Sequence, residues 1–142
     1  MRVRIVDGRQ SFLTIKSPRS GIARSEFQYA INYDDACRLM QLRQSEIIEK
    51  TRHCIENAGW LWEVDLFHGR NDGLLIAEVE LDDEHAAFVR PDWIGREVTG
   101  QRRFHNSQLA RHPYCEWQEK MPFVWDPAEV PPASRMLDMI AH

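Results

Sequence analysis

Apolar and polar residues alternate through much of the first 81 positions of the chain, which is the pattern of half-buried β-strands. Turn residues such as Asp7-Gly8 and Asn57-Ala58-Gly59 separate the alternating segments. Strands are predicted at residues 1–6, 12–16, 22–31, 46–55, 60–67 and 74–81.

Helical spacing is confined to short segments. Asn32 is predicted to cap a helix in which Ala36 and Met40 share one face. A short helix is predicted at residues 82–89, and an amphipathic helix at residues 133–141 follows a segment broken by prolines. About six short strands with few helices predict an α+β domain that is mainly antiparallel β, with the helices packed outside.

The polar face of each predicted strand carries full charges rather than neutral polar groups. In four strands, two like charges stand at a spacing of two, which points both side chains to one face of the strand. These pairs are Arg2/Arg4, Lys50/Arg52, Glu63/Asp65 and Glu78/Glu80. Like charges on one face repel each other, and a soluble surface does not need them. A half-exposed sheet whose mixed charges form cross-strand ion pairs is the simplest alternative, and it stays open.

A concavity lined by segregated cations and carboxylates would suit a polyanion that is bound together with a divalent metal ion. Lysine and arginine side chains hold phosphate oxygens. Carboxylates hold Mg²⁺ or Mn²⁺, which bridge to the phosphates of a substrate. Closing the sheet into a barrel with a charged lumen would also remove its exposed edges.

Composition limits the possible functional classes of the protein and its cellular compartment. The chain has 142 residues, a net charge of -4 and a charged fraction of 28%, so its bulk charge does not indicate nucleic-acid binding. Its three cysteines are too few and too scattered for a disulfide framework and fit a reducing compartment. No apolar run is long enough to span a membrane, and no signal-peptide core is present. We therefore expect a cytoplasmic protein that binds neither nucleic acid nor membranes.

The remaining histidines and tryptophans are expected to have structural roles. His105, His112 and Cys115 lack the spacing of a zinc site and are predicted to lie on a surface loop. The five tryptophans are predicted to pack outside the barrel.

In order and spacing, the charged strands resemble the CYTH, or triphosphate tunnel metalloenzyme, family. The segments that carry the resemblance are Leu13-Thr-Ile-Lys-Ser17, Arg24-Ser-Glu-Phe-Gln-Tyr29, Lys50-Thr-Arg-His53, Trp62-Glu-Val-Asp-Leu-Phe67, Ala77-Glu-Val-Glu-Leu81, Trp93-Ile-Gly-Arg-Glu-Val-Thr-Gly100 and Arg103-Phe-His-Asn-Ser-Gln-Leu-Ala110. Each segment is short, and their combination in this order is specific. The resemblance implies a CYTH-like barrel domain at residues 1–117, followed by a Pro-rich connection and a C-terminal helix at residues 118–142.

This family includes thiamine triphosphatases, inorganic tripolyphosphatases and class IV adenylyl cyclases, and its fold is an eight-stranded antiparallel tunnel. The resemblance implies metal-dependent binding and hydrolysis of an inorganic or organic triphosphate, with Mg²⁺ or Mn²⁺ as the cofactor. It assigns substrate binding to Arg2, Arg4, Lys16, Arg24, Lys50 and Arg52, with catalytic roles for Lys16 and Arg52. It assigns metal binding to Glu26, Glu78 and Glu80, with Glu63 and Asp65 as further candidates in the same lumen.

The chain departs from the family pattern at its start. It opens at the family's Arg-x-Arg strand, so the N-terminal Glu-x-Glu-x-Lys strand is expected to be missing and about six of the eight strands to remain. Gln28 stands where many relatives carry a second Glu. Two alternatives to hydrolysis stay open: a non-catalytic module that binds polyphosphate or a nucleotide, and an adenylyl cyclase-like activity. Unpaired strand edges on a shortened barrel favour a homodimer.

Overall fold

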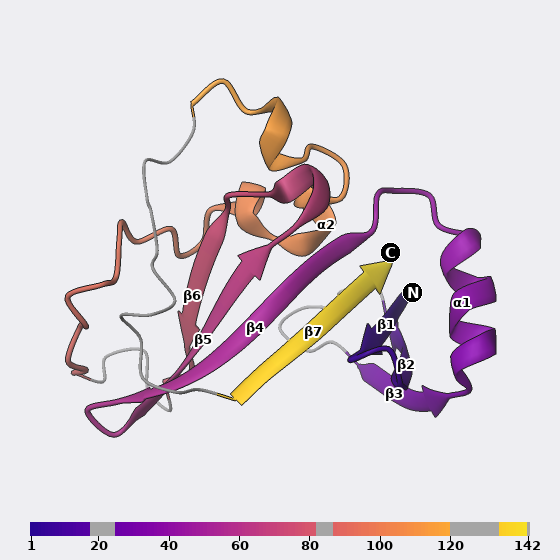
Figure 1. Ribbon diagram of the computed structural model, residues 1–142, viewed down its shortest axis with the longest axis horizontal. Helices are drawn as coiled ribbons and strands as arrows, with labels where there is room; N and C mark the ends of the chain where they lie inside the picture. Colours follow the sequence, from indigo (N-terminus) through magenta and orange to yellow (C-terminus); the bar gives the residue numbers. More distant parts are fainter. Residues whose placement is uncertain (18–24, 82–86, 120–133, 142) are drawn as a thin grey trace.

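The structure, a computed structural model, describes residues 1–17, 25–81, 87–119 and 134–141. In these ranges seven strands form one antiparallel sheet (Figure 1). The strands are β1 (Arg2–Val6), β2 (Gln10–Lys16), β3 (Glu26–Ile31), β4 (Ile48–Asn57), β5 (Trp60–Phe67), β6 (Leu75–Val79) and β7 (Ser134–Ala141). The α-helices are α1 (Tyr33–Gln41) and α2 (Asn106–Leu109), and the short 3-10 helices are η1 (Gly69–Asn71), η2 (Arg102–Phe104) and η3 (Tyr114–Glu116).

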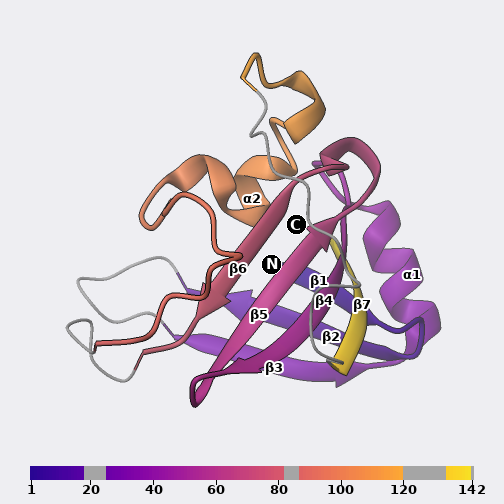
Figure 2. The same cartoon turned by 60° about the vertical axis from the view of Figure 1, so that its left-hand side comes forward.

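The strands lie in the order β3-β2-β1-β7-β4-β5-β6, and every neighbouring pair is antiparallel. In Figure 2 the strands β1–β3 run across β4–β6, so the sheet is strongly twisted and curved. Among the described residues, β3 and β6 form the two edges and do not pair with each other. The fold is therefore tunnel-like, but the sheet is not closed.

The C-terminal segment is a strand, and the prediction of an amphipathic helix at residues 133–141 is wrong. β7 lies between β1 and β4 and pairs with both, so that Met139 stands opposite Ile5 on one side and Glu49 on the other. Met, Leu and Ala favour a helix locally, but a segment that completes two ladders gains hydrogen bonds along both of its edges. The sheet therefore is not confined to residues 1–117, and seven strands are described rather than about six.

The predicted strands within the first 81 residues are present, with shifts at their ends. The helix predicted at residues 82–89 is not found in its described part, because residues 87–89 adopt neither helix nor strand and residues 82–86 lie outside the described ranges. Two tight turns set the hairpins of the sheet: Asp7 and Gly8 have φ of 49° and 63°, and Ala58 and Gly59 have φ of 50° and 81°. Positive φ at both central residues gives a turn whose twist matches that of the flanking strands.

Helix α1 covers the outer face of β1 and β2. The side chain of Asn32 caps it as predicted, accepting a hydrogen bond from the first-turn backbone at 2.8 Å. Ala36 and Met40 pack against Val3 and Ile5, so α1 lies on the face of β1 opposite its two arginines. In the described part of the chain, no helix is long and apolar enough to cross a membrane.

The segment from η2 to η3 closes one end of the opposite, concave face. Phe104, Leu109 and Tyr114 are buried in one cluster with Ile48 and Phe67, which share the face of Lys50. Figure 1 shows α2 beside the ends of β5 and β6. This packing places the start of α2 against the charged face of the sheet.

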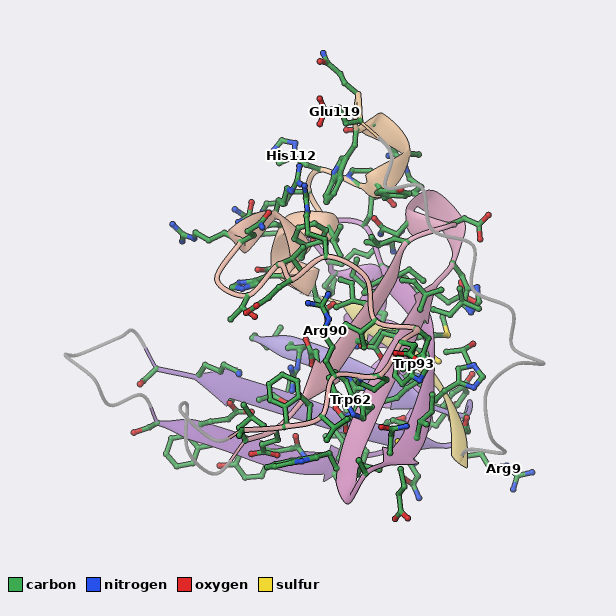
Figure 3. The ribbon with its side chains drawn as sticks, turned by 90° about the vertical axis from the view of Figure 1, so that its left-hand side faces the viewer. Arg9, Trp62, Arg90, Trp93, His112 and Glu119 are labelled. Carbon is green, nitrogen blue, oxygen red and sulfur yellow. The ribbon has the colours of Figure 1, made fainter. Side chains whose placement is uncertain are left out.

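Tryptophans gather on the outer side of β5, as predicted. The rings of Trp62 and Trp93 meet edge to face with centroids 5.7 Å apart (Figure 3), and Trp60 packs in the same cluster. Trp117 instead packs against Phe104 at the end of the sheet. Trp125 lies outside the described residues.

Candidate functional site

The concave face of the sheet contains a cleft of about 580 Å³. Among the described residues, its charged lining consists of Arg2, Arg4, Lys16, Lys50, Arg52, Asp65 and Glu78. Five of the six cations predicted to bind phosphate therefore line one cavity, and the sixth, Arg24, lies outside the described residues. They converge because residues opposite each other in antiparallel strands point to the same face, so the alternation within each strand is repeated across the sheet.

The wall formed by β1, β2 and β3 is mainly cationic. Lys16 stands opposite Glu26 and forms an ion pair with it at 2.6 Å. Arg2 donates to the hydroxyl of the buried Thr14 at 3.4 Å and lies 3.9 Å from Glu26. Its Nε is buried and has no hydrogen-bond partner among the described residues.

The wall formed by β4, β5 and β6 carries cations and carboxylates in direct contact. Arg52 stands opposite Asp65, and its Nε and Nη2 donate to the two carboxylate oxygens at 2.7 and 2.8 Å. The Nη1 of Arg52 donates to Glu63 at 2.5 Å, and Nη2 lies 4.0 Å from Glu78. The ammonium group of Lys50 forms a buried ion pair with Asp65.

These contacts fix the charge states of the cluster. Burial alone would raise the pKa of Asp65, but hydrogen bonds from Arg52 and Lys50 and the charges of both cations outweigh it and lower the pKa below its ordinary value. The hydrogen bond to Asp65 is the main cause that raises the pKa of Arg52. Near neutral pH Asp65 and Arg52 are therefore both charged.

The residues at the start of α2 form a polar wall that the strand pattern did not reveal. His105, Asn106 and Ser107 line the cleft, and His105 is exposed in the bend before α2, in agreement with the prediction of a surface loop. The only signal in the sequence was the resemblance of the Arg103–Ala110 segment to the family. No alternation marks this wall because the segment belongs to no strand, and the burial of Phe104 and Leu109 holds it against the sheet.

The predicted metal ligands do not form a preformed site. In the ranges that the structure covers, no three side chains of His, Cys, Asp or Glu are arranged to hold a metal ion. Glu26 contacts Lys16, Glu78 is 65% exposed beside Arg52, and Glu80 is an exposed residue just after β6. Carboxylate oxygens are the donors that Mg²⁺ and Mn²⁺ prefer, so the chemistry of this set fits such an ion. The metal-binding assignment stays a prediction.

Comparison with known proteins places the chain in a family. Residues 1–112 match the model of the CYTH domain, and the chain therefore belongs to the CYTH domain family.

Two relatives have functional names. An inorganic triphosphatase of Acetivibrio thermocellus is 45% identical over 120 residues, which are 84% of this chain and 76% of the relative. An inorganic triphosphatase of Nitrosomonas europaea is 36% identical over 106 residues, or 72% of this chain and 70% of the relative. No solved structure matches the chain.

Proposed function

We propose that this protein binds inorganic triphosphate in the cleft and hydrolyses it with the help of Mg²⁺ or Mn²⁺. The observation that carries the proposal is the set of five cationic side chains on one concave face, in a chain whose relatives are named inorganic triphosphatases. A linear triphosphate carries several negative charges along a chain of oxygens. Arginine and lysine side chains spread over both walls of a cleft are suited to bind such a chain along its length.

The lining supports an inorganic substrate rather than a nucleotide. Its aromatic residues in the described ranges are Phe67 and Phe104, which are 1% and 7% exposed. Both rings are used in the packing of the end of the sheet, so neither offers a free face for a base. This observation favours triphosphatase activity over an adenylyl cyclase-like activity.

Phosphoryl transfer requires the protein mainly to position the phosphates and to stabilise the charge that develops on them. Arg2 and Arg4 would hold one end of the triphosphate, and Lys50 would contact the other. Lys16 and Arg52 would contact the reacting phosphoryl group. Water would attack the terminal phosphorus, the bond to the bridging oxygen would break, and orthophosphate and pyrophosphate would leave.

The proposed metal ligands are Glu26, Glu78 and Glu80, with Glu63 and Asp65 as further candidates. A bound divalent ion would neutralise phosphate oxygens and lower the pKa of the attacking water. In the structure Glu26 contacts Lys16, while Glu63 and Asp65 contact Arg52.

A phosphate-release assay with sodium tripolyphosphate tests this function. We expect release with Mg²⁺ or Mn²⁺ and none with chelator, and a loss of about 100-fold or more in Lys16→Met, the size of effect seen when one stabilising donor is removed. Arg9→Gln is the matched control, because Arg9 lies in the exposed turn after β1, where its side chain points outward (Figure 3), and it does not line the cleft. Binding of tripolyphosphate without release under any condition would favour the non-catalytic module. Equal rates in Lys16→Met and wild type would overturn the assignment of Lys16.

A further inference from the structure

Lys50, Asp65 and Arg52 form a buried cluster in the wall of the cleft. The side chains of Lys50 and Asp65 are 5% and 4% exposed, and that of Arg52 is 17% exposed. Asp65 accepts hydrogen bonds from both Nε and Nη2 of Arg52 and pairs with Lys50, while Glu63 accepts from Nη1. All three nitrogens of the guanidinium group thus face carboxylate oxygens.

The cations of the two walls are paired with carboxylates that differ in their exposure to solvent. Lys50 and Arg52 contact Asp65 and Glu63, so two positive charges meet two negative ones. On the β1–β2 wall, Lys16 and Arg2 both lie beside one carboxylate, that of Glu26, whose side chain is 44% exposed. On the β4–β5 wall an anion has to replace Asp65, whose side chain is only 4% exposed.

We propose that Asp65, assisted by Glu63, is an internal counter-ion that determines which anions the cleft accepts. An anion displaces Asp65 from Lys50 and Arg52 only if further phosphoryl groups are held at the same time by the β1–β2 wall. A short anion such as orthophosphate, which is a product of the proposed reaction, cannot span both walls and binds weakly. This inference rests on the proposed function and adds to it a residue that discriminates substrate from product.

If Asp65 only positioned Arg52, its removal would change the anion affinity in the opposite direction. If the carboxylate only positioned Arg52, its removal would disorder the guanidinium group and weaken the binding of every anion. If the carboxylate competes with the ligand, its removal frees two cations and strengthens anion binding. The direction of the change in affinity therefore separates the two roles.

Isothermal titration calorimetry without metal ions provides the test, using sodium tripolyphosphate and sodium orthophosphate as ligands. We expect Asp65→Asn to bind orthophosphate about tenfold more tightly, since a competing charge-assisted hydrogen bond is worth roughly that factor. The increase in affinity for tripolyphosphate is expected to be smaller, so the ratio of the tripolyphosphate affinity to the orthophosphate affinity decreases. Glu63→Gln should shift both affinities in the same direction by less.

Glu49→Gln is the control for the loss of one negative charge, because Glu49 is exposed and alternates with Lys50 onto the other face of β4. Its anion affinities should equal those of wild type. Unchanged or weaker binding in Asp65→Asn and Glu63→Gln would overturn the inference. If Asp65→Asn does not fold, Glu63→Gln decides alone, since the Glu63 side chain is 39% exposed and tolerates the change.

If the proposed function is wrong, the binding and phosphate-release experiments give a different result. In that case folded wild-type protein would neither bind tripolyphosphate nor release phosphate from it. Tripolyphosphate binding gained by Asp65→Asn would then still support the counter-ion role, and its absence would overturn both proposals.

Discussion

At the scale of single residues, Arg52 lies at the centre of the charged cluster. Three carboxylates from β5 and β6 lie within 4.0 Å of its guanidinium group. The planar fork of an arginine makes two parallel hydrogen bonds to one carboxylate, as Arg52 does with Asp65. Lysine keeps the charge but cannot form this pair of bonds.

We therefore expect Arg52→Lys to lose about tenfold to 100-fold in kcat for tripolyphosphate hydrolysis while the protein remains folded. Steady-state phosphate release, with circular dichroism to check folding, measures this. Arg70→Lys is the control, since Arg70 pairs with Glu46 and Glu116 on the surface. A kcat for Arg52→Lys equal to that of the control would show that the fork geometry is not used.

The lowered pKa of Asp65 makes the free energy of unfolding depend on pH. A carboxylate whose pKa is lower in the folded state than in the unfolded one stabilises the fold above its unfolded pKa. That stabilisation is lost as pH falls from the ordinary aspartate value of 3.8 through the lowered folded value.

In urea unfolding, we accordingly expect the difference in free energy of unfolding between wild type and Asp65→Asn to be constant from pH 5 to 8. Below the ordinary aspartate pKa the difference should shrink, because the wild-type carboxylate becomes protonated as well. A difference that stays the same down to the lowest accessible pH would contradict the ion-paired state of Asp65.

At the scale of elements, β7 joins the two halves of the sheet. It pairs with β1 on one side and β4 on the other, so the β1–β3 wall and the β4–β6 wall of the cleft are connected through its backbone. A central strand pairs along both of its edges, so its backbone N–H groups are needed for ladder hydrogen bonds. The geometry of the cleft therefore depends on β7.

Proline at the centre of β7 should separate the two halves. We expect Met139→Pro to lose cooperative thermal unfolding, since proline in the middle of a sheet removes a ladder hydrogen bond. Met139→Leu keeps volume and backbone and should unfold close to wild type. A Met139→Pro protein with an unchanged Tm would show that β7 is not required between β1 and β4.

At the scale of the whole molecule, a net charge of -4 coexists with a cleft that gathers five cations. The bulk charge therefore does not describe the field at the site, which depends on which side chains share the concave face. An anion bound there contacts both halves of the sheet and stabilises the folded chain relative to the unfolded one.

We expect tripolyphosphate to raise the Tm, with about 2.7 kcal/mol of stabilisation when the ligand is at 100 times its Kd. Sodium chloride should reduce this shift, because exposed parts of the contacts are screened. Differential scanning fluorimetry at several ligand concentrations measures the effect, with Lys16→Met giving a smaller shift and Arg9→Gln an unchanged one. A Tm independent of tripolyphosphate in the wild type would contradict binding in the cleft.

The sequence by itself determined the strands of the first 81 residues and the side chains that share their polar faces. Both follow from an alternation with a period of two, which is a local property of the chain. That period placed Lys50 and Arg52 together on one face of β4. It also placed Val3 and Ile5 on the face of β1 opposite Arg2 and Arg4. The same locality explains the cap at Asn32, which depends on residues of the first helical turn.

Only the tertiary structure decided the rest. β7 is a strand because β1 and β4 both offer it a partner, whereas its own residues favour a helix. His105 to Ser107 reach the cleft because Phe104 and Leu109 are buried at the end of the sheet. Asp65 holds both Arg52 and Lys50 because the register of β4 and β5 sets it opposite Arg52, and register is a relation between strands that no single segment contains.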